Sequence, residues 1–364
     1  MRTLLVGLGG MLWGLLVPAS VTAAREPYLA IRTGLKCSHC HTNHTGGGKR
    51  TDFGAIYSQT RLPLSVVRGG DEGALLAPQL ARYLSLGANA RFRVWQQFTG
   101  ENPKNEFEMA EANLYAEARV VPERVTVYAD QALAPGNLRT RELFLLLERL
   151  PGEGYLKLGR FFLPYGFRLL DDGEYVRQRT GFNFANADLG VELGLEPGPL
   201  SLALAVSNGT QGAAENNNAK QLSALVSLVF RDLRVGASAS RNVGPAGRRD
   251  LIGGFGGFRL GRLALLGEAD LIVDDPPTGR RGDQFAAFIE GNLLVAQGVN
   301  AKVSYGYLDP DRDIGENARI RLRFGGELFA IQFLQLSAFY TLLDDIPQAR
   351  TDRDRLSLEL HAFF

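Results

Sequence analysis

Apolar and polar residues alternate along most of the chain. From about Leu84 to the C-terminus, segments of about ten residues with a period of two are separated by turn residues. In the segment 318–328, polar side chains occupy one face and apolar side chains the other: Arg319, Arg321, Arg323 and Glu327 against Ile320, Leu322, Phe324 and Leu328. A half-polar strand repeated many times is typical of a transmembrane β-barrel, so we predict an all-β protein.

The connections between these segments alternate in length, as they do in outer-membrane barrels. Short turns are expected at Pro122-Glu123, 151–154, 197–199, Arg231-Asp232, Gly261-Arg262 and Gln297-Gly298. Longer loops are expected near 99–106, 132–139, 163–184, 209–218, 243–249, 275–282, 309–316 and 345–352. The pattern predicts an antiparallel barrel of about 16 strands with both ends in the periplasm. A soluble β-sandwich would not explain the alternating loop lengths.

The last strand agrees with a barrel. Leucines and Phe364 alternate with polar residues, and the chain stops on an aromatic side chain. By parity with Phe364, His361 is expected to face the lumen near the periplasmic rim.

The first residues predict an export signal. Arg2 gives a positive start, an apolar run follows to Val17, and 22–24 are small residues suited to cleavage. A transmembrane anchor is the alternative, but the run is short and Pro18 interrupts it. The division of the chain is therefore 1–24 signal peptide, 25–83 N-terminal segment and 84–364 barrel, located in the outer membrane of a Gram-negative bacterium. A formal net charge of +1 argues against a nucleic-acid partner.

One short motif carries chemistry. Cys37-Ser38-His39-Cys40-His41 reads C-x-x-C-H, the attachment signature of haem c. Two thiols at this spacing add to the haem vinyl groups, and the following imidazole of His41 reaches the iron. A zinc site would need a second cysteine pair, and the chain has only two cysteines. A redox dithiol would need a surrounding βαβ pattern, which is absent. We predict one covalent haem c on Cys37 and Cys40, with His41 as the proximal ligand.

The sixth iron ligand stays open. His361 and His44 are the two histidine hypotheses, although His44 follows the proximal ligand by only three residues and His361 could be a lumen residue with no such role. His39 lies inside the attachment loop, Met109 lies in a strand far along the chain, and a water ligand is a further alternative. The segment 25–83 is small and thin in apolar residues, so we expect it to lodge in the barrel or against its periplasmic mouth. Gly46 to Arg50 is expected to form a flexible turn against haem or wall.

Residues 28–34, 37–42 and Phe53-Gly54 together resemble the haem segment of the fused outer-membrane monohaem cytochrome–porins of iron-oxidising bacteria. The resemblance covers the whole architecture, a haem segment joined to a barrel of sixteen strands. It implies electron transfer from extracellular Fe(II) through the haem to a periplasmic c-type cytochrome. Such a protein would be an Fe(II):cytochrome c oxidoreductase. The stretch 46–48 and the short chain depart from the family, which leaves other redox metals as donors.

The same residues also allow other functions. A diffusion or substrate-specific porin could use the N-terminal segment as a plug or redox gate, with Arg91, Arg93 and the arginines of 319–323 as an anion-selective stripe. A haem peroxidase would need His44 or His361 as a distal group. Acidic residues near 171–172, 274–275, 309–313 and 344–345 are expected at the outer end, where they could concentrate divalent cations or bridge them to lipopolysaccharide. Porin-like trimers exist, so a homotrimer stays among the assemblies considered.

Overall fold

A computed structural model describes residues 26–67, 79–81, 83–98, 104–171, 173–184, 186–215, 217–345 and 354–364. The predicted signal peptide lies outside the described residues, as do parts of the loops near 99–106 and 345–352. In the described part of the chain, no helix is long and apolar enough to span a membrane.

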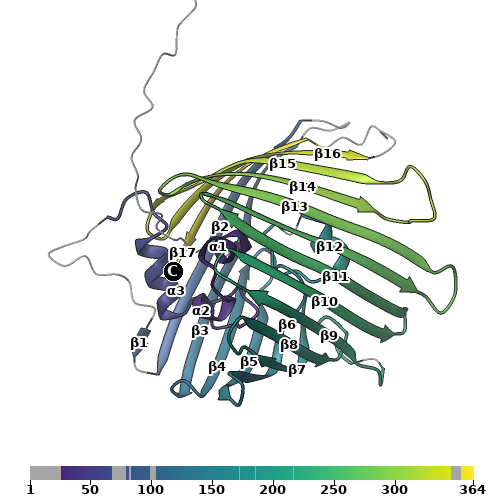
Figure 1. The fold of residues 1–364 in the computed structure, drawn as a ribbon, viewed down its shortest axis with the longest axis horizontal. Helices are drawn as coiled ribbons and strands as arrows, with labels where there is room; N and C mark the ends of the chain where they lie inside the picture. The colour runs from purple at the N-terminus through teal and green to yellow at the C-terminus, as the bar shows by residue number, and fades with distance from the viewer. Residues whose placement is uncertain are drawn as a thin grey trace, which may run out of the picture.

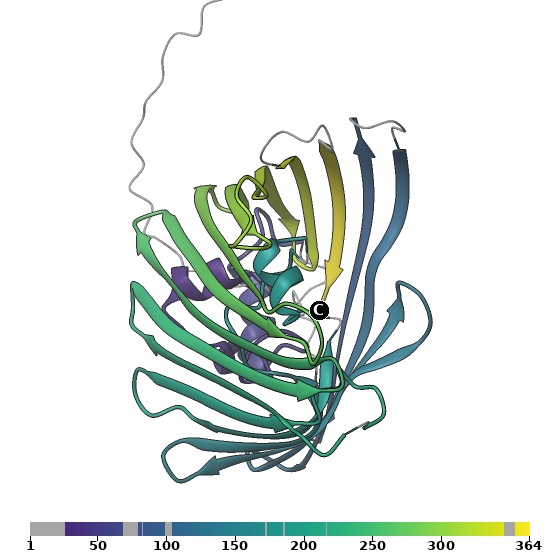
Figure 2. The same cartoon turned by 90° about the vertical axis from the view of Figure 1, so that its right-hand side faces the viewer.

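Sixteen antiparallel strands form a closed barrel in the described chain (Figures 1 and 2). Each strand pairs with the next in sequence, and β17 pairs with β2 to close the ring. A short strand, β1 (Gln79–Ala81), pairs with the start of β2. The barrel strands are β2 (Leu84–Gln97), β3 (Lys104–Val121), β4 (Val125–Ala134), β5 (Arg139–Leu150), β6 (Gly154–Phe162), β7 (Ala187–Leu195), β8 (Leu200–Ser207), β9 (Gln221–Val229), β10 (Leu233–Gly244), β11 (Gly247–Leu260), β12 (Leu263–Asp275), β13 (Gly282–Ala296), β14 (Val299–Asp309), β15 (Arg319–Ile331), β16 (Leu334–Asp345) and β17 (Arg355–Phe363). The predicted barrel of sixteen strands is confirmed, and its first strand in the ring, β2, begins at Leu84.

The strands are polar inside and apolar outside. In β7, Leu189, Val191 and Leu193 are 54%, 43% and 45% exposed, whereas Glu192 between them is fully buried. In β15, Phe324 faces outward and Arg321 and Glu327 are buried, as the alternation predicted. An apolar belt around a closed sheet with no free edge is the solution that lets strands cross a bilayer.

Short turns join the strands at one end of the barrel and longer loops join them at the other, in agreement with the predicted alternation. One predicted loop is wrong: 243–249 contains only a two-residue turn, because β10 runs to Gly244 and β11 begins at Gly247. These two glycines pair directly, and Gly247 has a φ of +107°, so the backbone turns where a side chain would resist it. In outer-membrane barrels the short turns face the periplasm.

The N-terminal segment 26–67, which we call the plug, lies inside the barrel at the short-turn end (Figures 1 and 2). It contains α1 (Pro27–Thr33), α2 (Cys37–Cys40) and α3 (Asp52–Thr60). Helix α1 packs on β11 and β12, and its Tyr28, Leu29 and Ile31 are buried in one cluster with wall residues. The backbone N–H of Leu64 donates to the carbonyl of Phe329 at 2.7 Å, near a short turn. This position agrees with the predicted placement of the segment against the lumen wall.

Buried ion pairs attach the plug to the wall. Lys302 of β14 lies 3.1 Å from Glu26 of the plug and 3.4 Å from both Glu290 and Glu327. The Tyr28 hydroxyl donates to Glu327 at 2.7 Å. Since a buried charge is stable only when it is paired, these contacts specify where the plug sits.

The turn of Gly46, Gly47 and Gly48 packs closely against the barrel wall, as predicted. All three glycines have positive φ. A Cβ on Gly48 would collide with the Tyr128 hydroxyl, which accepts a hydrogen bond from the Lys49 N–H at 3.0 Å. Glycine is therefore required by both the backbone conformation and the close approach.

The connection from β6 to β7, residues 163–186, folds back into the barrel, and we call it the inward loop. It carries α4 (Tyr175–Thr180), which packs on β12, β13 and β14. Arg177 of this helix pairs with Glu268 in the wall, and Arg321 of β15 donates to Glu174 at 2.8 Å. The inward loop and the plug meet in the lumen, because Phe167, Leu169 and Val176 share a buried cluster with α1.

Candidate functional site

The C-x-x-C-H motif opens into a pocket inside the barrel. Cys37 and Cys40 are the first and last residues of α2, and His41 is its C-cap, donating its N–H to the Cys37 carbonyl at 2.9 Å. Both cysteines are free thiols, and both line the pocket together with His41. Burial, with the Cys37 thiol beside it, raises the pKa of Cys40 to about 11. The sequence motif thus presents two thiols and an imidazole to one space, which we call the inner pocket.

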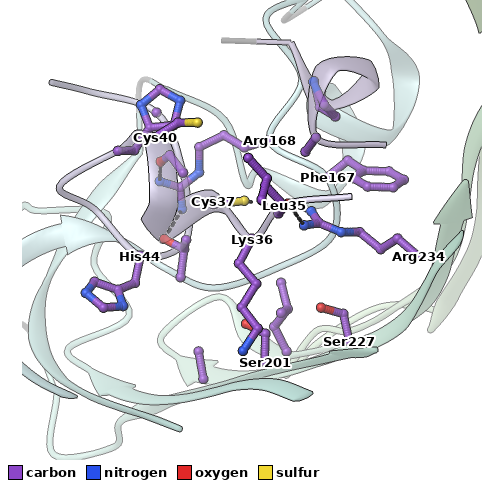
Figure 3. A pocket seen from close by; sticks show the side chains of 18 of the residues that line it. Leu35, Lys36, Cys37, Cys40, His44, Phe167, Arg168, Ser201, Ser227 and Arg234 are labelled. Carbon is purple, nitrogen blue, oxygen red and sulfur yellow. Dashed lines mark hydrogen bonds between the residues drawn. The ribbon is translucent and has the colours of Figure 1, made fainter. Parts of the chain in front are cut away.

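The walls of the inner pocket come from the plug, the inward loop and the barrel (Figure 3). The water-accessible space is about 90 Å³, so the pocket is narrow. Its apolar side chains include Leu29 and Leu35 from the plug, Phe167 from the inward loop, and Leu225 and Phe255 from the wall. The fit to haem c rests on the chemistry of the donor set: Cys37 and Cys40 would hold it covalently and His41 would bind its iron.

His44 also lines the inner pocket, but both of its ring nitrogens have other contacts. Nδ1 lies 3.2 Å from Glu196 and Nε2 lies 3.4 Å from Glu148, and the ring contacts that of Tyr155 at a tilt of 38°, with 4.1 Å between centroids. Burial alone would lower the pKa of His44, but the hydrogen bonds to Glu148 and Glu196 outweigh it and hold this pKa above its usual value. Because both ring nitrogens already contact carboxylates, this geometry disfavours His44 as the sixth ligand.

The raised pKa of His44 predicts a pH dependence of stability. A histidine whose pKa is raised by folding stabilises the fold fully below its ordinary pKa of 6.5, and this contribution is lost as the pH rises through the folded-state value. Relative to a His44→Gln variant, the wild-type free energy of unfolding should fall by roughly 1 kcal/mol between acidic and alkaline buffer. Urea unfolding at a series of pH values measures this difference; parallel curves for the two proteins would contradict the assignment.

The other histidine hypothesis receives no support from the structure. His361 faces the lumen, as the parity of β17 predicted, and is 2% exposed. Its Nδ1 lies 2.8 Å from Gln335 Oε1 and its Nε2 contacts Asn89 Oδ1, and it does not line the inner pocket. Met109 is 45% exposed, so it faces away from the lumen. His39 is exposed on α2.

A second cavity lies in the lumen on the long-loop side, and we call it the outer chamber. Its water-accessible volume is about 650 Å³. Glu26, the first described residue of the plug, lines both cavities, so the outer chamber and the inner pocket are neighbours in the lumen. The predicted arginine stripe is present in its lining, together with acidic residues: Arg91, Arg93, Arg319, Arg321, Arg323 and Arg355 with Asp171, Glu327 and Glu359.

Many of these charges are paired with one another. Arg321 and Arg323 both contact Asp171, at 2.7 and 2.9 Å, and Arg93 contacts Glu359 at 2.9 Å. At the outer end, Asp274 pairs with Arg249, and Asp311 and Asp313 pair with Arg280. Among the described residues there is no cluster of three metal-ligating side chains. The acidic residues at this end thus act first as partners of arginines.

Sequence comparison gives no relatives. No protein-family model matches the chain, and no curated protein matches it.

Solved structures of outer-membrane proteins share its fold. An anion-selective porin from Comamonas acidovorans superposes with a TM-score of 0.63 at 12% identity, covering 77% of this chain and 99% of that one. A loop-deletion mutant of OmpT from Vibrio cholerae gives 0.62 at 16% identity, over 78% and 100% of the two chains. The outer-membrane channel DcaP of Acinetobacter baumannii gives 0.61 at 13% identity, over 77% and 97%. The chain therefore has the fold of the outer-membrane porins, and this fold and the apolar belt together confirm the predicted location in the outer membrane of a Gram-negative bacterium.

Proposed function

We propose that the protein is an outer-membrane cytochrome–porin that carries electrons across the membrane through one covalent haem c. The observation that carries this proposal is the position of the motif: Cys37, Cys40 and His41 open together into a narrow, largely apolar pocket inside a barrel. The haem, when bound, supplies a one-electron Fe(III)/Fe(II) couple. Apolar walls exclude water from such a couple, and covalent attachment keeps it in place.

The arrangement of the two cavities supports a direction of access. The outer chamber lies toward the long-loop end and shares Glu26 in its lining with the inner pocket. On the other side, a cleft lined by Lys36, His39 and His44 opens between short turns. An extracellular donor, Fe(II) by the family resemblance, would approach from the first side, and a periplasmic c-type cytochrome would dock at the second. With that donor the protein is an Fe(II):cytochrome c oxidoreductase.

A substrate-specific porin is the second function that an observation favours. The barrel fold is that of porins, and the outer chamber places arginines opposite acidic residues, an arrangement that selects solutes by charge. The plug and the inward loop occupy the inner part of the lumen, so a solute pathway would need one of them to move. A homotrimer, the form in which OmpT of Vibrio cholerae was solved, belongs to this proposal as well.

An anaerobic visible spectrum separates these functions. The full chain is made in a host that matures c-type cytochromes, purified in detergent, oxidised and mixed with Fe(II). We expect the reduced c-type spectrum to develop promptly and to match that produced by dithionite. A haem that dithionite reduces and Fe(II) does not would remove Fe(II) as the donor. If the protein shows no haem spectrum, the substrate-specific porin remains as the proposed function.

A further inference from the structure

Two arginines beside the cysteines have no acidic partner in the described chain. Arg234, at the start of β10, is 7% exposed; it donates to the Leu35 carbonyl at 2.8 Å and lies 3.8 Å from Cys37 Sγ. Arg168, in the inward loop, donates to the Gly46 carbonyl at 2.8 Å. Both line the inner pocket (Figure 3), and neither has a described carboxylate within 4 Å.

Many buried cations elsewhere in this lumen form ion pairs with carboxylates. Arg177 pairs with Glu268, Lys157 with Glu192 at 2.8 Å, and Arg141 with Glu111 at 2.7 Å. The same holds for Lys49, Arg91, Lys302 and Arg321. Each of these cations thus has a carboxylate partner from the wall, the plug or the inward loop, as a buried charge requires. Arg168 and Arg234 lack such a carboxylate partner, and both lie in the inner pocket beside the haem-attachment motif.

The Nε of Arg234 is buried without a hydrogen-bond partner among the described atoms. The guanidinium group of Arg168 donates only to neutral oxygens in its described hydrogen bonds, those of residues 45–46 and 162–163. Burial lowers the pKa of Arg168, although the more distant Glu142 and Glu192 act in the opposite direction. Each arginine is therefore suited to accept an anionic group from the pocket side.

We propose that Arg168 and Arg234 bind the two propionate carboxylates of the haem. This rests on the proposed function, since it assigns partners to the same cofactor. A haem has two anionic groups, and Arg168 and Arg234 are the two arginines of the pocket lining; Lys36, a third cation there, donates to the backbone carbonyl of Glu196. Because Arg168 belongs to the inward loop and Arg234 to the wall, the haem then fastens three parts of the structure together: plug, loop and barrel.

The test compares charge-removing and charge-keeping variants of the full-length protein. Arg168→Gln, Arg234→Gln and their double variant remove the cations, and the two Arg→Lys variants keep them. Arg241→Gln is the matched control, because this arginine pairs with Asp250 and its side chain is 61% exposed. Haem per polypeptide is measured from the absorbance spectrum, the midpoint potential by spectroelectrochemical titration, and folding by heat-modifiable migration on gels.

A cation next to the haem favours the ferrous over the ferric state. Each Gln variant should therefore change the Fe(II)/Fe(III) ratio at fixed potential by roughly tenfold toward Fe(III), about 59 mV for a one-electron couple. Loss of haem from a folded Gln variant would also support the proposal if the Lys variant regains it. Lysine should restore most of the shift, and Arg241→Gln should change nothing.

Two results would overturn the proposal. The first is a folded double Gln variant with wild-type haem content and wild-type potential. The second is a loss of haem in the Gln variants that the Lys variants do not restore; the arginines would then serve only to link the carbonyls of Leu35 and Gly46 to the rest of the structure. Both results leave the cytochrome assignment intact. A wild-type chain that takes up no haem would remove the proposed function itself, so the two failures are distinguishable.

Discussion

Replacing Cys37 and Cys40 together by serine is expected to abolish covalent haem completely. The two thiols stand at the ends of the single-turn helix α2 and share the inner pocket, so each is placed to bond one side of the same flat group. Serine keeps the size of the side chain and removes the sulfur nucleophile, and therefore leaves the plug packed. Peroxidase staining after denaturing electrophoresis measures the attached haem, because only thioether-bound haem stays with the polypeptide.

The chain provides a matched control inside the motif. His39 lies between the two cysteines and is exposed, so His39→Ala should keep full staining. His41→Ala keeps both cysteines, so it should retain thioether-bound haem, and its visible spectrum should differ from that of the wild type because the proximal ligand is lost. Equal staining of the serine double variant and the wild type would contradict the attachment site.

How far the sequence alone could go is clearest in the barrel. Each strand has its own alternation, and most short turns contain a Pro, Gly or Asp, so the signals are local and the strand number followed from them. The loop near 243–249 failed because Gly244 and Gly247 were taken as loop residues, whereas they pair across a tight turn. Glycine signals a turn in sequence, but it does not say how many residues the turn contains.

The inner pocket was only half predictable. Cys37, Cys40 and His41 follow from a contiguous motif, whereas Arg168 and Arg234 lie far from it in sequence and come close only through the fold. The inward folding of 163–186 was also missed, since that stretch was expected to be an external loop. Its apolar residues, among them Phe167, Leu169 and Val176, were the available signal, because a solvated loop has no use for them. The pairing of His44 with two glutamates depends on three separate turns and strands, and no local pattern encodes it.

Removing the plug is expected to turn a poorly conducting barrel into an open channel. A sixteen-stranded porin barrel leaves an aqueous lumen, and here the inner end of that lumen contains α1, α2 and α3. Deletion of 26–67 from the mature chain should raise single-channel conductance in planar bilayers by on the order of tenfold relative to the full chain. The inward loop stays in both proteins, so the difference reports the plug alone.

The barrel wall can tolerate this deletion, which keeps the experiment informative. Lys302 loses Glu26 but retains Glu290 and Glu327, each at 3.4 Å, and Glu117 loses Lys49 but retains Arg119. No wall cation in this group is left without a carboxylate, so the deletion avoids the large penalty of an unpaired buried charge. A full chain that already conducts like an open porin would contradict the occluded lumen and favour the solute channel. A deletion variant that stays closed, yet shows the heat-modifiable migration of a folded barrel, would assign the occlusion to the inward loop instead, where Arg177 and Arg321 hold it against the wall.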